Sequence, residues 1–124
     1  MPVPILKQGD ALIASIQSAL MDRDLVQLRD DIADQIGQFR SRGVIIDVTA
    51  LDVLDSFATR TLRSIAYMAK LRGANTVVVG IQPDVAFAMV QLGLSLDGVA
   101  TTLDLEEGLA HLRSLTHPGV LRDR

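Results

Sequence analysis

The sequence predicts a single α/β domain with a mixed, mostly parallel β-sheet and the element order β-β-α-β-α-β-α-β-α. Two observations predict this fold class. Short runs of branched apolar residues, such as Val44–Val48 and Thr76–Val79, alternate with longer stretches in which apolar residues recur every three or four positions. Turn-forming or helix-capping residues stand at most of the boundaries between them. Because strands that alternate with helices usually pair in parallel through right-handed crossovers, the later strands should be parallel.

A β-hairpin is expected at the start of the chain. Pro4–Lys7 and Ala11–Ile16 are strand candidates, and the intervening Gln8-Gly9-Asp10 is a turn signal. Such a short connection favours antiparallel pairing, which would give the sheet its antiparallel component.

A long amphipathic helix should follow the hairpin. Asp22 or Asp24 can cap its start, and the helix should run to about Arg42, with Gly43 as a plausible C-terminal stop. Its apolar stripe comprises Leu25, Leu28, Ile32, Ile36 and Phe39.

The rest of the chain should continue to alternate. Val44–Val48 is mostly branched and apolar, which suits a central strand covered on both faces. The remaining elements should be a helix from Phe57 to near Arg72, a strand at 76–79, a helix from Pro83 to Gly93 with Val85, Met89 and Leu92 facing inward, a strand at 99–101, and a helix from Leu105 to Leu115. Asp104 and Glu107 resemble a capping box for the last helix. The domain would occupy residues 1–115, and residues 116–124 would form a polar C-terminal tail.

The composition limits the classes of function. The net charge of −3 and the pI near 5.2 argue against a nucleic-acid-binding protein, which normally carries a basic surface. The absence of cysteine removes disulfides and thiolate chemistry, and it is compatible with a cytoplasmic protein. No apolar run approaches the ~20 residues of a membrane span, and no signal peptide is evident at the N-terminus.

The stretch Val44–Arg63, VIIDVTALDVLDSFATRTLR, carries the one specific site that the sequence offers. A buried strand leads into a short connector, which places Ser56 in the first turn of the next helix. The N–H groups of a first turn have no intrahelical acceptor, and the helix dipole is positive at this end. A phosphate on Ser56 would lie where helices favour anions, so the position suits a switch rather than a catalyst.

Ser56 could also be an ordinary helix-start residue that only satisfies backbone donors. However, the positions that would complete a capping box after Asp55 or Ser56 hold Ala58 and Thr59 instead of Glu or Gln. Arg60 lies one turn after Ser56 and could bind its phosphate through charge-assisted hydrogen bonds. A solvated surface role for Arg60 stays equally open.

Other residue patterns do not match a known catalytic, metal or cofactor site. Asp47 ends a strand as the phosphoaccepting aspartate of a receiver domain does, but the acidic pair and lysine that complete such a site are missing, so Asp47 should accept loop hydrogen bonds. His111 and His117 have no acidic partner at metal-ligand spacing. Phosphate-binding glycine loops and the nucleophile elbow of hydrolases are also absent from the sequence. We therefore expect a non-enzymatic protein without a metal or cofactor.

Two passages carry a resemblance to a known family. LDSFATR at 54–60 and GIQPDVA at 80–86 stand in register along a complete domain. They resemble the STAS domains of anti-anti-sigma factors and, within that family, the RsbS type of stressosome scaffold subunit. The resemblance extends from about Pro4 to Leu115 and implies a single SpoIIAA-like STAS domain with helices stacked on a mixed sheet.

The resemblance also implies a phosphorylation switch. Its site is Ser56, flanked by Asp55 and Arg60, with Thr59 as a weaker alternative. Its partner is an RsbT-like serine kinase, which the scaffold holds in a stressosome beside RsbR-like STAS paralogues and releases on phosphorylation. An RsbX-like phosphatase would reset Ser56, and the scaffold should form a homodimer within the large complex.

Three further points bear on the subtype. Simple anti-anti-sigma factors carry a small residue and then Gly after the phosphoserine, whereas this chain has Phe57 and Ala58. RsbR-type paralogues carry a sensory domain before the STAS domain, whereas this sequence begins at its first strand, which favours the scaffold. Asp22 and Asp24 stand where the family contacts its kinase, so they are kinase-docking candidates. A ligand-sensing or simple anti-anti-sigma STAS module is the alternative.

Overall fold

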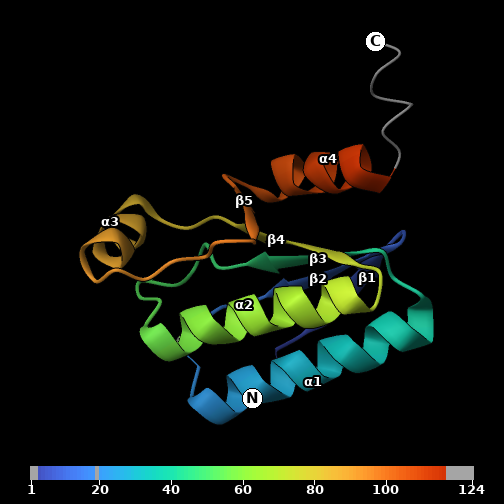
Figure 1. Ribbon diagram of the computed structural model, residues 1–124, viewed down its shortest axis with the longest axis horizontal. Coiled ribbons are helices and arrows are strands. Elements are labelled where there is room, and N and C mark those ends of the chain that lie inside the picture. Colours follow the sequence, from blue (N-terminus) through green and yellow to red (C-terminus); the bar gives the residue numbers. More distant parts are fainter. Residues whose placement is uncertain (1–2, 19, 117–124) are drawn as a thin grey trace.

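The computed structural model describes residues 3–18 and 20–116, which form one five-stranded sheet with helices on both of its faces (Figure 1). The strands lie in sequence order, and only the first pair is antiparallel. The strands are β1 (Ile5–Gln8), β2 (Ala11–Ser15), β3 (Gly43–Asp47), β4 (Asn75–Val79) and β5 (Ala100–Thr102). The helices are α1 (Asp22–Phe39), α2 (Ser56–Leu71), α3 (Pro83–Gln91) and α4 (Leu105–Thr116). The predicted element order and mixed sheet are confirmed.

The central strands are buried on both faces because helices cover both. Successive side chains of a strand point to opposite sides, so each strand contributes to two cores. The larger core lies under α1 and α2 and includes Leu12, Val44, Ile46, Leu62, Ile65 and Val78. The smaller core lies under α4 and consists of Ala11, Ile13, Ile45, Val77, Val79 and Leu112. Figure 1 shows α4 alone on its side of the sheet. The continuous apolar runs of β3 and β4 therefore reflect burial on both faces, as predicted.

The end of α1 differs from the prediction. The helix ends at Phe39 because Arg40 adopts the left-handed conformation, with φ of 52°, and its N–H donates to the Ile36 carbonyl. Gly43 is not the stop but the first residue of β3. A Cβ on Gly43 would come within 2.7 Å of Leu112 Cδ1, so this glycine serves the packing of α4 on the sheet.

Two residues expected on apolar faces point outward. Phe39 is exposed and lies beneath the Lys7 ammonium, whose Nζ is 5.6 Å from the centre of the ring. Leu92 follows α3 as its C-cap and is 72% exposed. In both cases the helix ends at this position, so its apolar face no longer dictates where the side chain lies.

The observed bounds of α2, β5 and α4 differ from the predicted ones by a residue or two. α2 begins at Ser56 rather than at Phe57, and β5 covers 100–102 rather than 99–101. The predicted Asp104 capping box is present only in part: Asp104 Oδ1 accepts the Glu107 N–H at 2.8 Å, whereas the Glu107 carboxylate accepts the N–H of Leu103 at 3.2 Å. Thr116, expected to begin the tail, is the last residue of α4, and residues 117–124 lie outside the described part of the chain.

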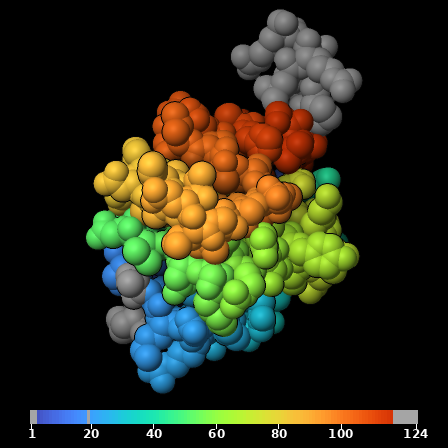
Figure 2. Space-filling model, turned by 60° about the vertical axis from the view of Figure 1, so that its left-hand side comes forward, coloured from blue at the N-terminus to red at the C-terminus, as the bar shows by residue number. Residues whose placement is uncertain are grey.

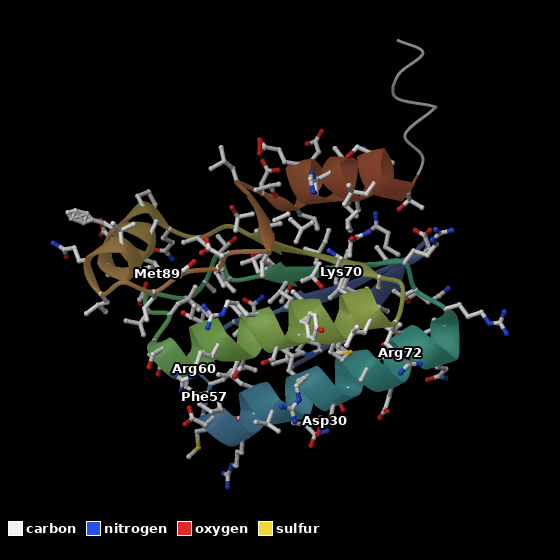
Figure 3. All side chains as sticks on the ribbon, viewed as in Figure 1. Asp30, Phe57, Arg60, Lys70, Arg72 and Met89 are labelled. Atoms are coloured by element: carbon white, nitrogen blue, oxygen red, sulfur yellow. The ribbon has the colours of Figure 1, made fainter. Side chains whose placement is uncertain are left out.

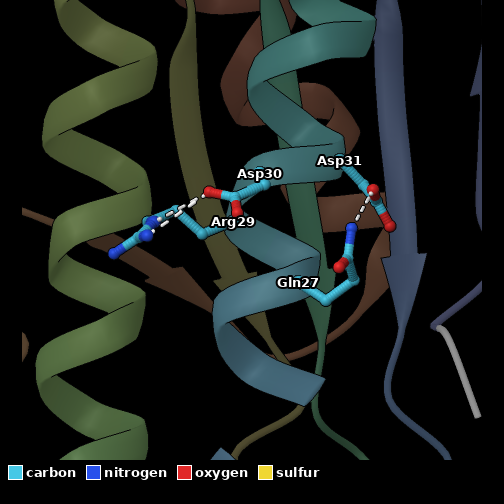
Figure 4. A network of polar contacts seen from close by, with 4 residues as sticks. All are labelled: Gln27, Arg29, Asp30 and Asp31. Atoms are coloured by element: carbon cyan, nitrogen blue, oxygen red, sulfur yellow. Dashed lines mark hydrogen bonds and ion pairs between the residues drawn. The ribbon is translucent and has the colours of Figure 1, made fainter. Parts of the chain in front are cut away.

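The outer face of α1 is polar, as its pattern predicted. The Gln27 amide donates to Asp31 at 2.8 Å, and Arg29 pairs with Asp30 at 3.3 Å (Figure 4). Among the helices in residues 3–18 and 20–116, none combines the length and apolar character needed to cross a membrane.

Candidate functional site

The loop between β3 and α2 holds the candidate site. Its first turn is closed by Asp47, whose Oδ1 accepts the Thr49 N–H at 2.9 Å and the Thr49 hydroxyl at 2.6 Å. The prediction that Asp47 accepts loop hydrogen bonds is thus confirmed. Leu51 and Leu54 are buried in the larger core and anchor the loop to the domain. The loop is therefore fixed at both of its ends when it delivers the chain to Ser56.

Ser56 is the first residue of α2, and its side chain is exposed. The residue before it, Asp55, is extended and forms the N-cap, with its Oδ1 accepting the Ala58 N–H at 2.7 Å. Asp is a favoured N-cap because its carboxylate satisfies a first-turn donor. This cap fixes where α2 begins. It therefore holds the Ser56 hydroxyl in solvent at the positive end of the helix dipole.

Two other candidates follow Ser56 on α2. Thr59 is only 2% exposed, and its hydroxyl donates to the Asp55 carbonyl at 2.8 Å. Arg60 is exposed, and Figure 3 shows it with Phe57 at the same end of α2. The structure thus brings Asp55, Ser56 and Arg60 together at the surface and buries the hydroxyl of Thr59.

The kinase-docking candidates lie at the start of α1, at the same end of the domain as Ser56 (Figure 1). A cavity of about 70 Å³ between the two helix starts is lined by Leu25 of α1 together with Asp55 and Ala58. Neither predicted cap is the N-cap, which is Met21. Asp24 instead accepts the Met21 N–H at 3.1 Å from inside the helix, and Asp22 is the exposed first residue. Asp24 therefore stabilises the helix start, and Asp22 faces solvent.

α3 adjoins the loop between β3 and α2 and exposes apolar side chains. Gln82, its N-cap, donates from Nε2 to the Thr49 carbonyl at 2.6 Å. Phe87 is 58% exposed and Val90 is 79% exposed, whereas Val85 and Met89 are buried as predicted. Figure 2 shows α3, the loop before α2 and the start of α1 on one face of the molecule.

The apolar surface of α3 was not predicted. The signal was present in the spacing, because positions 87 and 90 fall off the stripe formed by 85 and 89. Of the two histidines, His111 lies in α4 and His117 lies outside the described residues. Within the described ranges, no three histidine or acidic side chains gather where they could hold a metal ion.

Comparison with known proteins places this geometry in a family. The model of the STAS domain family matches residues 3–107. A structure of Moorella thermoacetica RsbS with a serine-to-glutamate substitution is 38% identical, with a TM-score of 0.78 over 92% of this chain and 97% of that one. A chain from the molecular architecture of the stressosome, described as a signal integration and transduction hub, is 36% identical, with a TM-score of 0.74 over 92% and 99% of the two chains.

A curated relative is longer than this chain. The RsbT co-antagonist protein RsbRA of Bacillus subtilis strain 168 is 27% identical over 90 residues, which are 73% of this chain and 33% of RsbRA. The chain thus spans about a third of that relative. Since the family model covers most of the sequence and the likeness to RsbS covers nearly all of both chains, this protein belongs to the STAS domain family.

Proposed function

We propose that this protein is a non-enzymatic signalling scaffold of the RsbS type, which holds an RsbT-like serine kinase in a stressosome and releases it when Ser56 is phosphorylated. The observation that carries the proposal is the exposed Ser56 hydroxyl at the first position of α2. The 38% identity to RsbS and the 36% identity to a stressosome chain support the choice of complex.

The kinase would cover the end of the domain at which α1, α2 and α3 present Asp22, Ser56 and Phe87. An exposed aromatic side chain is the kind of residue that anchors a protein interface, and Phe87 offers one. Asp22 would act at the rim, where charges mainly steer association. The hydrogen bond between Gln82 and Thr49 would keep the apolar and phosphorylatable parts of this surface in a fixed arrangement.

Phosphorylation would weaken this interface through charge. A phosphoserine carries about −1.5 to −2 charges at neutral pH. The positive end of α2 and Arg60 favour that charge, but the Asp55 carboxylate already binds the first-turn N–H of Ala58. The domain thus compensates only part of the negative charge of the phosphate. The uncompensated charge would lie against a kinase surface that is matched to a neutral hydroxyl. A poorly paired buried charge costs several kcal/mol, and about 1.4 kcal/mol is a factor of ten in affinity.

The same proposal includes the other partners that the family resemblance implies. RsbR-like paralogues would assemble with this chain through related STAS domains, in keeping with the 27% identity to RsbRA. An RsbX-like phosphatase would remove the phosphate, and the scaffold would act as a homodimer in a large cytoplasmic complex.

The test is to incubate the purified protein with its switch kinase and ATP–Mg²⁺ and to map phosphate by mass spectrometry. Phosphate on Ser56, absent from Ser56→Ala, would support the switch. Stable kinase binding without phosphate on Ser56 would contradict the switch and leave a scaffold that is regulated through a partner subunit. If the protein neither binds the kinase nor gains phosphate, the ligand-sensing alternative is favoured.

A further inference from the structure

A basic pocket of about 260 Å³ lies at the end of α1 and α2 that is remote from Ser56. We call it the arginine pocket, and its lining consists of Ile36, Gly37, Arg40, Ser41, Arg42, Arg72 and Gly73. Figure 3 shows Arg72 at one end of α2 and Arg60 at the other. The 16 residues of α2 separate the two ends by roughly 24 Å. From its charge and its unusual backbone, we infer that the arginine pocket binds a phosphate group.

The pocket is strongly positive although the chain as a whole carries a net charge of −3. Three arginine residues line it, no acidic residue does, and none of the three forms a salt bridge with a described carboxylate. α1 and α2 both end here, and each helix C-terminus contributes about −0.5 charge. These two ends offset about one of the three positive charges, so a net of about +2 is left for a ligand.

Ser41 supplies an independent indication of a ligand. It is 3% exposed, and its buried hydroxyl has no hydrogen-bond partner within the described residues. A buried hydroxyl that lacks a partner costs free energy, and such groups are rare in folded proteins. Because Ser41 lines the pocket beside Arg40 and Arg42 while its Oγ is covered, a rotation of the side chain would be needed for an oxyanion there to accept from the hydroxyl.

At two positions around the pocket, the residue type is not the one that the local backbone conformation favours. Arg40 is the only non-glycine residue with positive φ in the described ranges, at a helix end where glycine is preferred. Gly37 lies inside α1, where glycine disfavours the helix, and a Cβ there would come within 2.9 Å of Arg72 Nη2. The missing side chain thus leaves room for the Arg72 guanidinium. Departures of this kind gather at functional sites, and here they coincide with the unpartnered Ser41.

The chemistry of the lining defines the class of ligand. Guanidinium groups bind phosphate oxygens in bidentate fashion, and a hydroxyl adds one further donor. Pockets for drug-sized ligands usually measure about 300–1,000 Å³, so this smaller, open pocket suits one phosphate group rather than a whole cofactor. The group could belong to a free phosphate ion or to a phosphorylated side chain of another protein. The phosphate of the same chain's Ser56 is too far away.

The test uses the full-length, ¹⁵N-labelled protein titrated with inorganic phosphate, with sodium chloride keeping the ionic strength constant. We expect saturable shifts of the Ser41, Arg42 and Gly73 amide signals and none at Ser56. Shifts that rise linearly over the whole surface, or that sodium chloride alone reproduces, would overturn the proposal. A parallel titration with O-phosphoserine separates the sources. Comparable binding would admit a phosphorylated side chain, and binding of inorganic phosphate alone would restrict the site to the free ion.

Three variants make the test specific. Arg72→Gln should weaken phosphate binding at least tenfold. Arg40→Gly should weaken it as well while keeping or raising the melting temperature, because glycine fits the left-handed position better. Arg23→Gln, which removes the same charge from the exposed start of α1, should bind as the parent does. Parent-like affinity in both Arg72→Gln and Arg40→Gly would overturn the proposal, and their unchanged amide spectra would show that each is folded.

Discussion

The side-chain amide of Gln82 donates a 2.6 Å hydrogen bond to the backbone carbonyl of Thr49, which lies 33 residues earlier in the sequence. The bond joins the N-cap of α3 to the loop that leads to Ser56 at the start of α2. Gly80 brings the two segments this close, since its φ is +82° and a Cβ there would collide with Thr49. The hydrogen bond and the close approach at Gly80 thus hold the segment before the candidate phosphosite against the start of α3.

Gly80→Ala should destabilise the protein more than Gly98→Ala does. Both glycines have nearly the same positive φ, +82° and +83°, so each alanine carries a similar conformational cost of about 1–2 kcal/mol. Only the alanine at 80 also meets the Thr49 side chain and backbone, because position 98 has no atom within 4 Å. Overpacking of this kind adds about 1–3 kcal/mol. Urea unfolding of the two variants measures the difference. Equal midpoints would show that the loop around Thr49 adjusts to the added methyl group without a loss of stability.

Asp55→Ala should lower the free energy of unfolding by about 1 kcal/mol, because it removes the acceptor of the Ala58 N–H. For a chain of this length the melting temperature should fall by about 4 °C. Asp55→Asn keeps an N-capping oxygen and should retain most of the stability. If Asp55→Ala and Asp55→Asn have the same melting temperature, the cap contributes nothing to stability and another contact fixes the start of α2.

Ser56→Ala and Ser56→Asp should unfold within about 0.5 kcal/mol of the parent, since the side chain is exposed. Their affinities for the RsbT-like kinase should differ. The alanine variant should bind as the parent does, whereas the aspartate should weaken binding about tenfold or more, equivalent to about 1.4 kcal/mol. Calorimetric titration with the kinase provides the measurement, and equal affinities would refute release by charge.

Thr59 should carry no phosphate in the folded protein, even when Ser56→Ala removes the preferred site. Its hydroxyl is buried and donates to the Asp55 carbonyl, so a kinase would have to open the first turn of α2 to reach it. Mass spectrometry of Ser56→Ala after incubation with kinase and ATP–Mg²⁺ tests this. Phosphate on Thr59 would mean that this turn opens in the complex.

Asp22→Asn and Asp24→Asn should separate docking from folding. Asp24 accepts the Met21 N–H, so its neutralisation should lower the melting temperature by weakening the start of α1. Asp22 is exposed, so its neutralisation should leave the melting temperature unchanged and slow association with the kinase, most strongly at low salt. Stopped-flow association and thermal melts give the two readouts. An unaltered association rate in Asp22→Asn would exclude Asp22 from the docking surface.

The sequence predicted most of the fold because the responsible signals are local. Branched runs identify β3 and β4, and the spacing of apolar residues identifies the helices to within a few residues at their ends. The position of Ser56 at a helix start was equally local, since Asp55 is a favoured N-cap and the apolar pattern of α2 begins right after it.

The errors arise where tertiary packing decides. In the sequence, Gly43 resembles a helix stop, but its φ is not in the left-handed region that such a stop requires. A glycine stands there because Leu112 of α4 packs against the position and leaves no room for a side chain. The left-handed residue is Arg40, which no propensity would select. The arginine pocket was equally invisible, because Arg72 reaches Gly37 only through the packing of α2 against α1, 35 residues apart in sequence.

The shortness of β5 has a consequence for how this protein can associate. β5 is an edge strand of three residues, and it pairs with only the last three residues of β4. An edge this short offers few unpaired backbone groups to an incoming strand, which is one of the ways in which natural sheets avoid fibrous aggregation. In the large complex proposed above, copies of this chain would therefore resist sheet extension along β5. That safeguard would let many identical domains crowd together and still remain separately folded.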